Sequence, residues 1–307
     1  MKLIIICITL LFLESCSLSP VKDNQIDNRI LKIDFKDRYY GLFVNQFCQQ
    51  KNSKCPILFA FHGGGGEALK LDITTELVKL ADQKNVVIVY PNASNKHWND
   101  GRPEVNSQVE DIEFIDSVLA HINQKYSIDK KRVCATGISN GGLFSFRLAC
   151  ERSEIFSSVM PVAANMGLEK SKKCNLKKSI SILNIMGDED PLIPFNGGDI
   201  KGPLGLKKLG KVLSSFDTFE FWKKQLSCSS QTRSELAKVT KDGTSIEEIK
   251  SSKCKDGVLL NQIVVHGGGH TWPGGRAILS ERLVGKISNN YNASENLINF
   301  CISNPKK

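Results

Sequence analysis

The stretch VCATGISNGG, residues 133–142, decides the fold that we expect for this chain. Its first half is small, apolar and β-branched, as in a buried strand, and residues 140–152 have helical spacing. Between them lies the pattern Gly-x-Ser-x-Gly, with Ser139 at its centre. Glycines flank a serine in this way where a strand turns sharply into a helix and leaves no room for side chains. Ser139 is therefore a candidate nucleophile, and the alternative is a structural turn whose serine caps the helix.

Strands and helices alternate on both sides of this turn. Short apolar runs predict strands over residues 56–61, 86–90, 132–136, 158–163, 180–186 and 261–266. Helical spacing predicts helices over residues 68–84, 109–126, 140–152 and 292–303. We also expect an opening hairpin from residues 30–35 and 40–45, and a long loop over 195–216. This alternation indicates a mostly parallel central sheet with helices on both faces.

A glycine run, AFHGGGG at residues 60–66, follows the first of the buried strands. Its His-Gly-Gly-Gly form is typical of a loop that supplies a backbone amide to an oxyanion hole. Glycines allow such amides to approach a reacting carbonyl, and we expect the donors to be Asn140 and either Gly64 or Gly65. A phosphate-binding loop is the alternative, but no Lys-Ser or Lys-Thr pair follows the glycines. His62 is expected to tie the loop together.

Acidic residues follow another strand, in the segment IMGDEDPLIPF at residues 185–195. A carboxylate at this position lies at the carboxyl edge of a parallel sheet, where open α/β sheets place their sites. We choose Asp190 as the acid that pairs with a catalytic histidine. Asp188 is the alternative, and it otherwise forms the turn.

The candidate base lies in VHGGGHTWPG, residues 265–274, after the last clear strand. His270 is on a glycine-rich loop that can bring its imidazole to Ser139, whereas His266 ends the strand and is expected to pack or cap. The order Ser139, Asp190, His270 along the chain is that of the α/β-hydrolases. The sequence therefore predicts the α/β-hydrolase fold and a catalytic triad of these three residues.

Several longer segments together resemble a known family. They are FHGGGG, VIVYPN, WNDGR, VEDIEFI, GISNGG, FRLACERSEIFSSVMPVAA, GDEDPLIPF and GGGHTWPG, in order between about residues 40 and 300. This set resembles the secreted polyhydroxybutyrate depolymerase and feruloyl esterase family. The resemblance implies hydrolysis of polyester, feruloyl or acetyl esters by the same triad, without a metal or organic cofactor, and a Cys228–Cys254 disulfide. One departure is Met-Gly-Asp at 186–188, where the family usually has His-Gly-Thr.

Two tryptophans are candidates for substrate contact. Trp272 lies two residues after His270, and Trp98 lies in the loop that follows the strand at 86–90. Large aromatics at this edge of the sheet offer a flat apolar wall with a polar N–H group. The alternative is that they pack, with Trp272 lying beneath the His270 loop.

The first residues have the character of an export signal. Lys2 precedes an apolar run at residues 3–13, which is too short to span a bilayer. The sequence Leu-Glu-Ser-Cys at 13–16 resembles a lipobox, so Cys16 is a candidate for lipidation, and ordinary cleavage near Ser15 is the alternative. We expect a signal peptide over 1–16, a tether over 17–29 and one catalytic domain over 30–307. The expected location is the outer membrane through a lipid on Cys16, otherwise the periplasm or the exterior.

Cysteine usage agrees with export. Of the ten cysteines, Cys7 and Cys16 lie in the expected signal, which leaves an even number, eight, for an oxidising compartment. No Cys-x-x-Cys pair is present, so a zinc site is not expected. Neighbourhood along the chain suggests Cys48–Cys55, Cys150–Cys174 and Cys228–Cys254. Cys134 is expected to be a buried thiol.

Composition narrows the function classes that remain. The chain is 41% hydrophobic and 24% charged, as in an ordinary globular protein. Its net charge of +9 is spread along the sequence without a basic run interleaved with aromatics, so no nucleic-acid partner is expected. Two other functions stay open: a serine peptidase of the same fold, and a non-catalytic surface lipoprotein whose tryptophans bind carbohydrate.

Overall fold

The computed structural model describes residues 38–105, 108–202, 208–277 and 279–307. The expected signal peptide, Cys16, the tether and the strand expected at 30–35 all lie outside the described residues. Within the described ranges, no helix is both long and apolar enough to cross a membrane.

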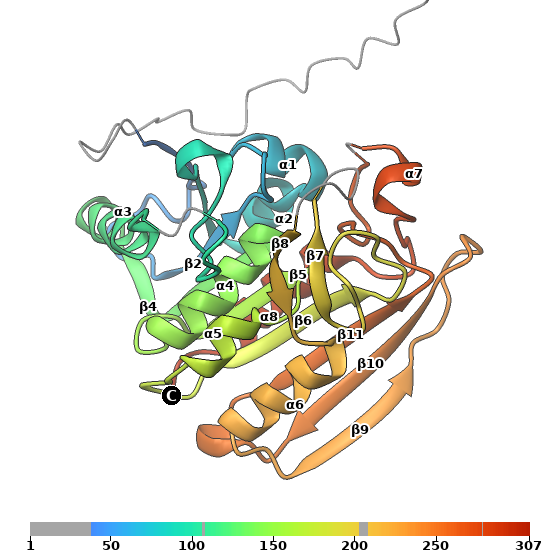
Figure 1. The fold of residues 1–307 in the computed structure, drawn as a ribbon. Helices are drawn as coiled ribbons and strands as arrows, with labels where there is room; N and C mark the ends of the chain where they lie inside the picture. Colours follow the sequence, from blue (N-terminus) through green and yellow to red (C-terminus); the bar gives the residue numbers. More distant parts are fainter. Residues whose placement is uncertain (1–37, 106–107, 203–207, 278) are drawn as a thin grey trace, which may run out of the picture.

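In the described part of the chain, a nine-stranded sheet forms the centre of the fold (Figure 1). Its strands lie in the order β1 (Tyr40–Phe43), β3 (Val87–Pro91), β2 (Cys55–Phe61), β4 (Ile128–Ile138), β5 (Ser158–Val162), β6 (Ser181–Gly187), β11 (Leu260–His266), β10 (Ser245–Ser252) and β9 (Ser230–Glu235). The six strands from β3 to β11 are parallel, and β1, β10 and β9 are antiparallel additions at the two edges. The mostly parallel sheet expected from the sequence is confirmed.

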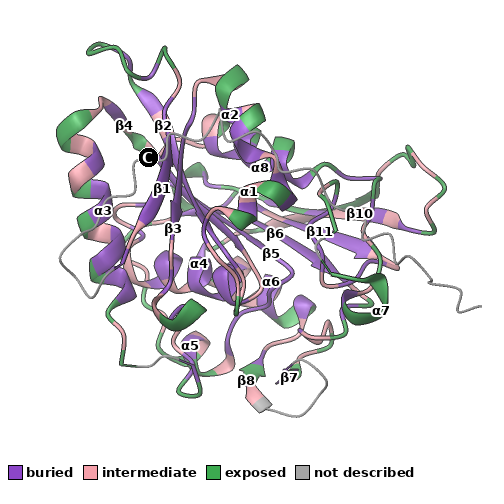
Figure 2. Cartoon of the chain, turned by 90° about the horizontal axis from the view of Figure 1, so that it is seen from above, coloured by how far each residue is buried: buried purple, intermediate pink, exposed green. Residues whose placement is uncertain are grey.

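Helices cover both faces of this sheet. They are α1 (Lys70–Thr75), α2 (Leu77–Lys84), α3 (Asp111–Lys125), α4 (Asn140–Glu151), α5 (Leu168–Lys172), α6 (Ser215–Gln225), α7 (Glu281–Val284) and α8 (Ala293–Ser303). Side chains of α3, α4 and α6 pack in one core cluster, and those of α1, α2 and α8 in another. Alternate residues of β2 enter the two clusters, so both faces of the sheet are apolar and buried (Figure 2).

Several segments differ from the sequence expectation, and neither the helix α6 nor the strand β10 was predicted. The helix expected over 68–84 is broken at Glu76, whose φ of 51° lies in the left-handed region, into α1 and α2. The loop expected over 195–216 contains a small hairpin of β7 (Gly198–Lys201) and β8 (Lys208–Val212), and the start of α6. The edge strand β9 was not expected, because its residues, SQTRSE, are polar and half-buried or exposed and carry no apolar period.

Among the residues that the structure describes, four disulfides cross-link the fold. Three of them are the pairs suggested by neighbourhood: Cys48–Cys55, Cys150–Cys174 and Cys228–Cys254. The expectation for Cys134 was wrong, because this residue of β4 is bonded to Cys301 of α8, 167 positions away in the sequence. The helix α8 packs across β4, and this places the two sulfur atoms together in the core.

Candidate active site

Ser139 lies on a strained turn between β4 and α4. Its φ of 58° and ψ of −124° are unusual for a residue with a side chain, and such a conformation costs roughly 1–3 kcal/mol. The turn is tight: a side chain at Gly137 would lie 2.6 Å from the backbone of Gly141 and 2.8 Å from the carbonyl oxygen of Phe61. The backbone N–H of Ser139 donates to the carbonyl of Val162 at 3.0 Å. Ser139 directly follows the carboxyl end of β4. Because it is only half-buried, it remains accessible from solvent.

Asp190 and His270 form a buried pair at the same edge of the sheet. The Nδ1 atom of His270 lies 2.7 Å from Oδ2 of Asp190, whose side chain is fully buried. The other oxygen, Oδ1, accepts hydrogen bonds from the backbone N–H groups of Leu192 at 2.8 Å and Ile193 at 2.9 Å. A carboxylate held in this way can keep the proton on Nδ1 and leave Nε2 as a base.

The other candidate acid, Asp188, contacts a different histidine. Its Oδ2 atom lies 2.8 Å from Nδ1 of His266, and the structure places Asp190 rather than Asp188 against His270. The strands β6 and β11 are parallel neighbours, which brings the two acid–histidine pairs side by side after their carboxyl ends.

The glycine loop after β2 lies against the turn that carries Ser139. A side chain at Gly64 would come within 3.7 Å of the Cβ atom of Asn140. Among the described residues, neither the amide of Gly64 nor that of Asn140 has a hydrogen-bond acceptor, so both are available to a developing oxyanion. The expectation for Gly65 was wrong, because its N–H donates to the carbonyl of Lys96 at 2.8 Å.

His62 ties this loop together, as the sequence predicted. Its Nδ1 atom lies 2.8 Å from the carbonyl oxygen of Gly63, and Nε2 accepts from the N–H of Ala93 at 3.1 Å. Burial lowers the pKa of His62 to about 4. The imidazole is therefore neutral at physiological pH and suited to hold backbone groups.

The side chain of Asn140 anchors the other half of the site. Its Nδ2 atom donates to Oδ2 of Asp100 at 2.7 Å and to the carbonyl of Trp98 at 3.0 Å, while Oδ1 accepts from the N–H of Trp98 at 2.8 Å. Asp100 in turn is paired with Arg102, whose Nε atom lies 2.9 Å from Oδ1. All four residues are buried. The amide of Asn140 is therefore positioned by a satisfied polar network beneath the turn.

The expectation that Trp98 and Trp272 contact substrate was wrong, because both side chains are buried, with 0% and 1% of their surface exposed. The indole of Trp98 stacks on Phe144 at 5.0 Å between ring centroids, and its N–H donates to the carbonyl of His62. Trp272 donates its N–H to Oγ of Ser294 at 2.9 Å. Both rings support the site from within the core and offer no face to a ligand.

The loop from His97 to Arg102 contributes more than the sequence analysis assigned to it. A Cβ atom added at Gly64 would lie 3.1 Å from the imidazole of His97, so this ring borders the glycine loop. Asp111 accepts from the N–H of Asn99 at 2.6 Å and pairs with Arg38 at 2.5 Å, and burial raises the pKa of this carboxyl despite the cation. The motif WNDGR at 98–102 was the signal available in the sequence.

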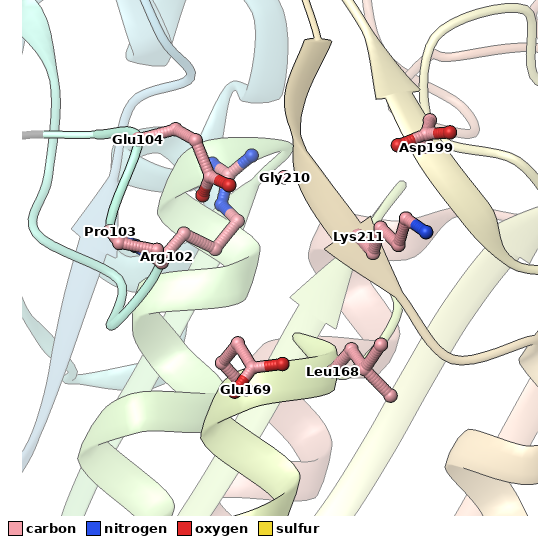
Figure 3. Close-up of a pocket in the computed structure, with 8 residues that line it drawn as sticks. All are labelled: Arg102, Pro103, Glu104, Leu168, Glu169, Asp199, Gly210 and Lys211. Carbon is pink, nitrogen blue, oxygen red and sulfur yellow. The ribbon is translucent and has the colours of Figure 1, made fainter.

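A hollow of about 190 Å³ opens beside Arg102 (Figure 3). Arg102, Pro103 and Glu104 lie on one wall, and Asp199 and Lys211 of the β7–β8 hairpin face them across the opening. The remaining lining residues are Leu168, Glu169 and Gly210. Ser139 does not line this hollow. In the described part of the chain, no group of three or more His, Cys, Asp or Glu residues is arranged to hold a metal ion.

Comparisons with known proteins define the class. The sequence model of the prolyl oligopeptidase family matches residues 78–192. An acetyl xylan esterase from Aspergillus awamori superposes with a TM-score of 0.55 at 15% identity, over 80% of this chain and 93% of that one. The chain has the α/β-hydrolase fold.

The curated relatives that match this chain have names of esterases. The putative esterase NocK of Nocardia uniformis subsp. tsuyamanensis is 27% identical over 92% of this chain and 84% of its own length. Feruloyl esterase B of Piromyces equi is 24% identical over 70% of this chain, which spans only 39% of that protein. The chain is thus similar in sequence to proteins named as esterases.

Proposed function

We propose that this protein is an exported serine esterase in which Ser139, Asp190 and His270 form the catalytic triad. The observation that carries the proposal is the buried Asp190–His270 pair, 2.7 Å apart, at the sheet edge where Ser139 occupies a strained turn. Parallel strands β4, β6 and β11 deliver the three residues to that edge. Catalytic groups cluster at this edge in open α/β sheets.

The reaction is a two-step acyl transfer. Oγ of Ser139 attacks the ester carbonyl carbon while Nε2 of His270 takes its proton, and the carbonyl oxygen becomes an oxyanion. The amides of Asn140 and Gly64 donate to that oxygen. The ester C–O bond then breaks, and His270 gives its proton to the departing alcohol.

Water completes the cycle. It attacks the acyl-enzyme carbon as His270 takes one of its protons, and that proton returns to Oγ of Ser139 when the acyl–serine bond breaks. The carboxylic acid leaves. Asp190 keeps Nδ1 protonated and oriented through both steps. No metal or organic cofactor takes part.

The substrate class that we propose is an ester of a hydroxycinnamic or acetic acid on a polysaccharide, or a polyester chain. Feruloyl esterases and a bifunctional acetylxylan esterase/xylanase among the relatives support the first two. The test is a hydrolysis panel of p-nitrophenyl esters of graded acyl length, methyl ferulate, acetylated xylan and polyhydroxybutyrate. Methyl ferulate or acetylated xylan should be cleaved faster than polyhydroxybutyrate, and the reverse order would reassign the enzyme to polyesters.

The triad is tested by substitution on the same panel. Ser139→Ala should lower kcat by about 1,000-fold or more, because no other group supplies the nucleophile. Ser145→Ala is the matched control: Ser145 is a buried serine one and a half turns along the same helix, bonded only to the carbonyl of Gly141. Full activity in Ser139→Ala would end the assignment.

A serine peptidase is the second candidate, because the matching family model is that of prolyl oligopeptidases. The model covers Ser139 and Asp190 but stops before His270. A proline p-nitroanilide belongs in the panel for this reason. Cleavage of this amide at a kcat/KM equal to that of the esters would favour the peptidase.

Export is proposed from the apolar signal and the lipobox-like sequence ending at Cys16. Four disulfides support it, since such bonds persist in oxidising compartments. A lipid on Cys16 is the contact with a membrane that we propose.

A further inference from the structure

We propose that Asp188 and His266 form a clamp that positions the loop carrying His270, so that Asp188 is a positioning residue for catalysis. The inference rests on the proposed function of His270 as the base. It assigns a role to the two residues that the triad leaves unused, including the aspartate that departs from the family pattern at 186–188.

One carboxylate holds two successive residues at the end of β11. Oδ2 of Asp188 lies 2.8 Å from Nδ1 of His266, and Oδ1 accepts from the N–H of Gly267 at 2.7 Å. Backbone bonds reinforce the contact: the N–H of Asp188 donates to Val265 at 3.1 Å, and that of Glu189 to Gly268 at 3.0 Å. The turn after β6 is thus bonded to each of the four residues 265–268.

The loop needs such a restraint because residues 267–269 are all glycine. Glycine loses more conformational freedom on ordering than any other residue, so an unrestrained triple-glycine segment would sample many positions. On its other side the loop is held by backbone bonds from Gly269 to Lys286, at 2.9 Å, and from His270 to Val284. The Asp188 side chain supplies the restraint on the side of β6.

The clamp and the catalytic pair share the same two segments. Asp188 and Asp190 lie in one turn, and His266 and His270 lie at the two ends of one loop. The contact between Asp188 and His266 therefore fixes the position of Asp190 relative to His270. A displacement of about 1 Å in such a pair can lower a rate about 100-fold.

The contribution of the clamp is to geometry rather than to overall stability. The side chains of His266 and Asp188 are 43% and 28% exposed, and exposed ion pairs contribute little to folding. Glu247 also approaches His266, with Oε2 3.7 Å from Nε2, but it makes no bond to the loop. Glu247→Gln is therefore the matched control, because it changes the charge around His266 and leaves the clamp.

The kinetic experiment compares Asp188→Ala, Asp188→Asn and Glu247→Gln on p-nitrophenyl acetate, well below the melting temperature. Asp188→Ala should lower kcat about 10- to 100-fold with KM within about twofold, since the loop moves the base and not the binding surface. Asp188→Asn retains an oxygen for the N–H of Gly267 and should recover part of that loss. Glu247→Gln should match the wild type. Wild-type kcat in Asp188→Ala would overturn the clamp.

A spectroscopic readout separates this inference from the proposed function. The Nδ1 proton of His270 in its bond to Asp190 should give a far-downfield proton resonance, which His270→Ala identifies by its loss. Asp188→Ala should shift or broaden that resonance, and Glu247→Gln should leave it unchanged. If the wild type cleaves none of the esters, the proposed function fails, while the resonance still tests the clamp. An unchanged resonance in Asp188→Ala would refute it.

Discussion

The disulfide between Cys134 and Cys301 should stabilise this protein more than its three shorter cross-links do. The bond joins β4, the strand that precedes Ser139, to the last helix, and its two cysteines are 167 positions apart in the sequence. Replacing both cysteines by alanine opens the loop that this bond closes. The matched comparison is the pair Cys48 and Cys55, which is equally buried but only seven residues apart.

The expected magnitudes follow from the entropy of the unfolded chain. A cross-link removes conformations from the unfolded state in proportion to the logarithm of the loop length. For a separation of 167 residues this corresponds to about 5 kcal/mol at 25 °C, and for a separation of 7 to about 2 kcal/mol. Because the four sulfur atoms are equally buried, the lost packing is similar in the two variants. The difference of about 3 kcal/mol therefore reports loop closure.

Urea unfolding of the oxidised proteins, followed by tryptophan fluorescence, measures both losses. All three tryptophans are buried, so unfolding exposes them and changes their emission. The Cys134→Ala, Cys301→Ala double variant should lose the larger free energy of unfolding. Equal losses in the two variants, or a larger loss for Cys48 and Cys55, would refute the reasoning from loop length.

Three further predictions concern the core, pH and the amino terminus. Trp98→Ala should lower the free energy of unfolding by about 3–5 kcal/mol and reduce kcat on every ester alike, because the ring is a core residue. A loss of activity on bulky esters alone would show instead that Trp98 contacts substrate. His62 has a pKa of about 4 when folded against 6.5 as a free side chain, so its neutral form is favoured by folding and its contribution is complete above pH 6.5. That contribution should be lost as the pH falls toward 4, by up to about 3 kcal/mol in urea titrations, and His62→Gln should flatten this part of the curve; an unchanged slope would contradict it. Full-length protein should partition into detergent in a bacterial host, and Cys16→Ser should release it to the aqueous phase; wild-type protein found wholly in the aqueous phase would exclude the anchor.

Local patterns in the sequence were sufficient for the architecture. Buried parallel strands are short apolar runs, and helices repeat every 3.6 residues, so most of the central elements could be predicted within a few positions. The turn at Ser139 is largely local, because the closest backbone atoms to a Cβ atom at Gly137 belong to Gly141 in the same turn; the carbonyl of Phe61 in the neighbouring strand adds a second clash. The chain order of Ser139, Asp190 and His270 followed from the strands that precede them.

Other features depended on contacts between distant segments. Whether Trp98 faces solvent is decided by Phe144, 46 positions later, and the partner of Cys134 by where α8 crosses the sheet. Gly65 is excluded from the oxyanion hole by the carbonyl of Lys96, which only the folded loop brings near. Which of Asp188 and Asp190 lies against His270 likewise depended on the tertiary structure, since two acids in one turn have the same local signature. The sequence by itself determined which elements form and where chemistry gathers, because periodicity and backbone sterics act locally; tertiary structure decided which groups meet, because burial and hydrogen-bond partners come from elsewhere in the chain.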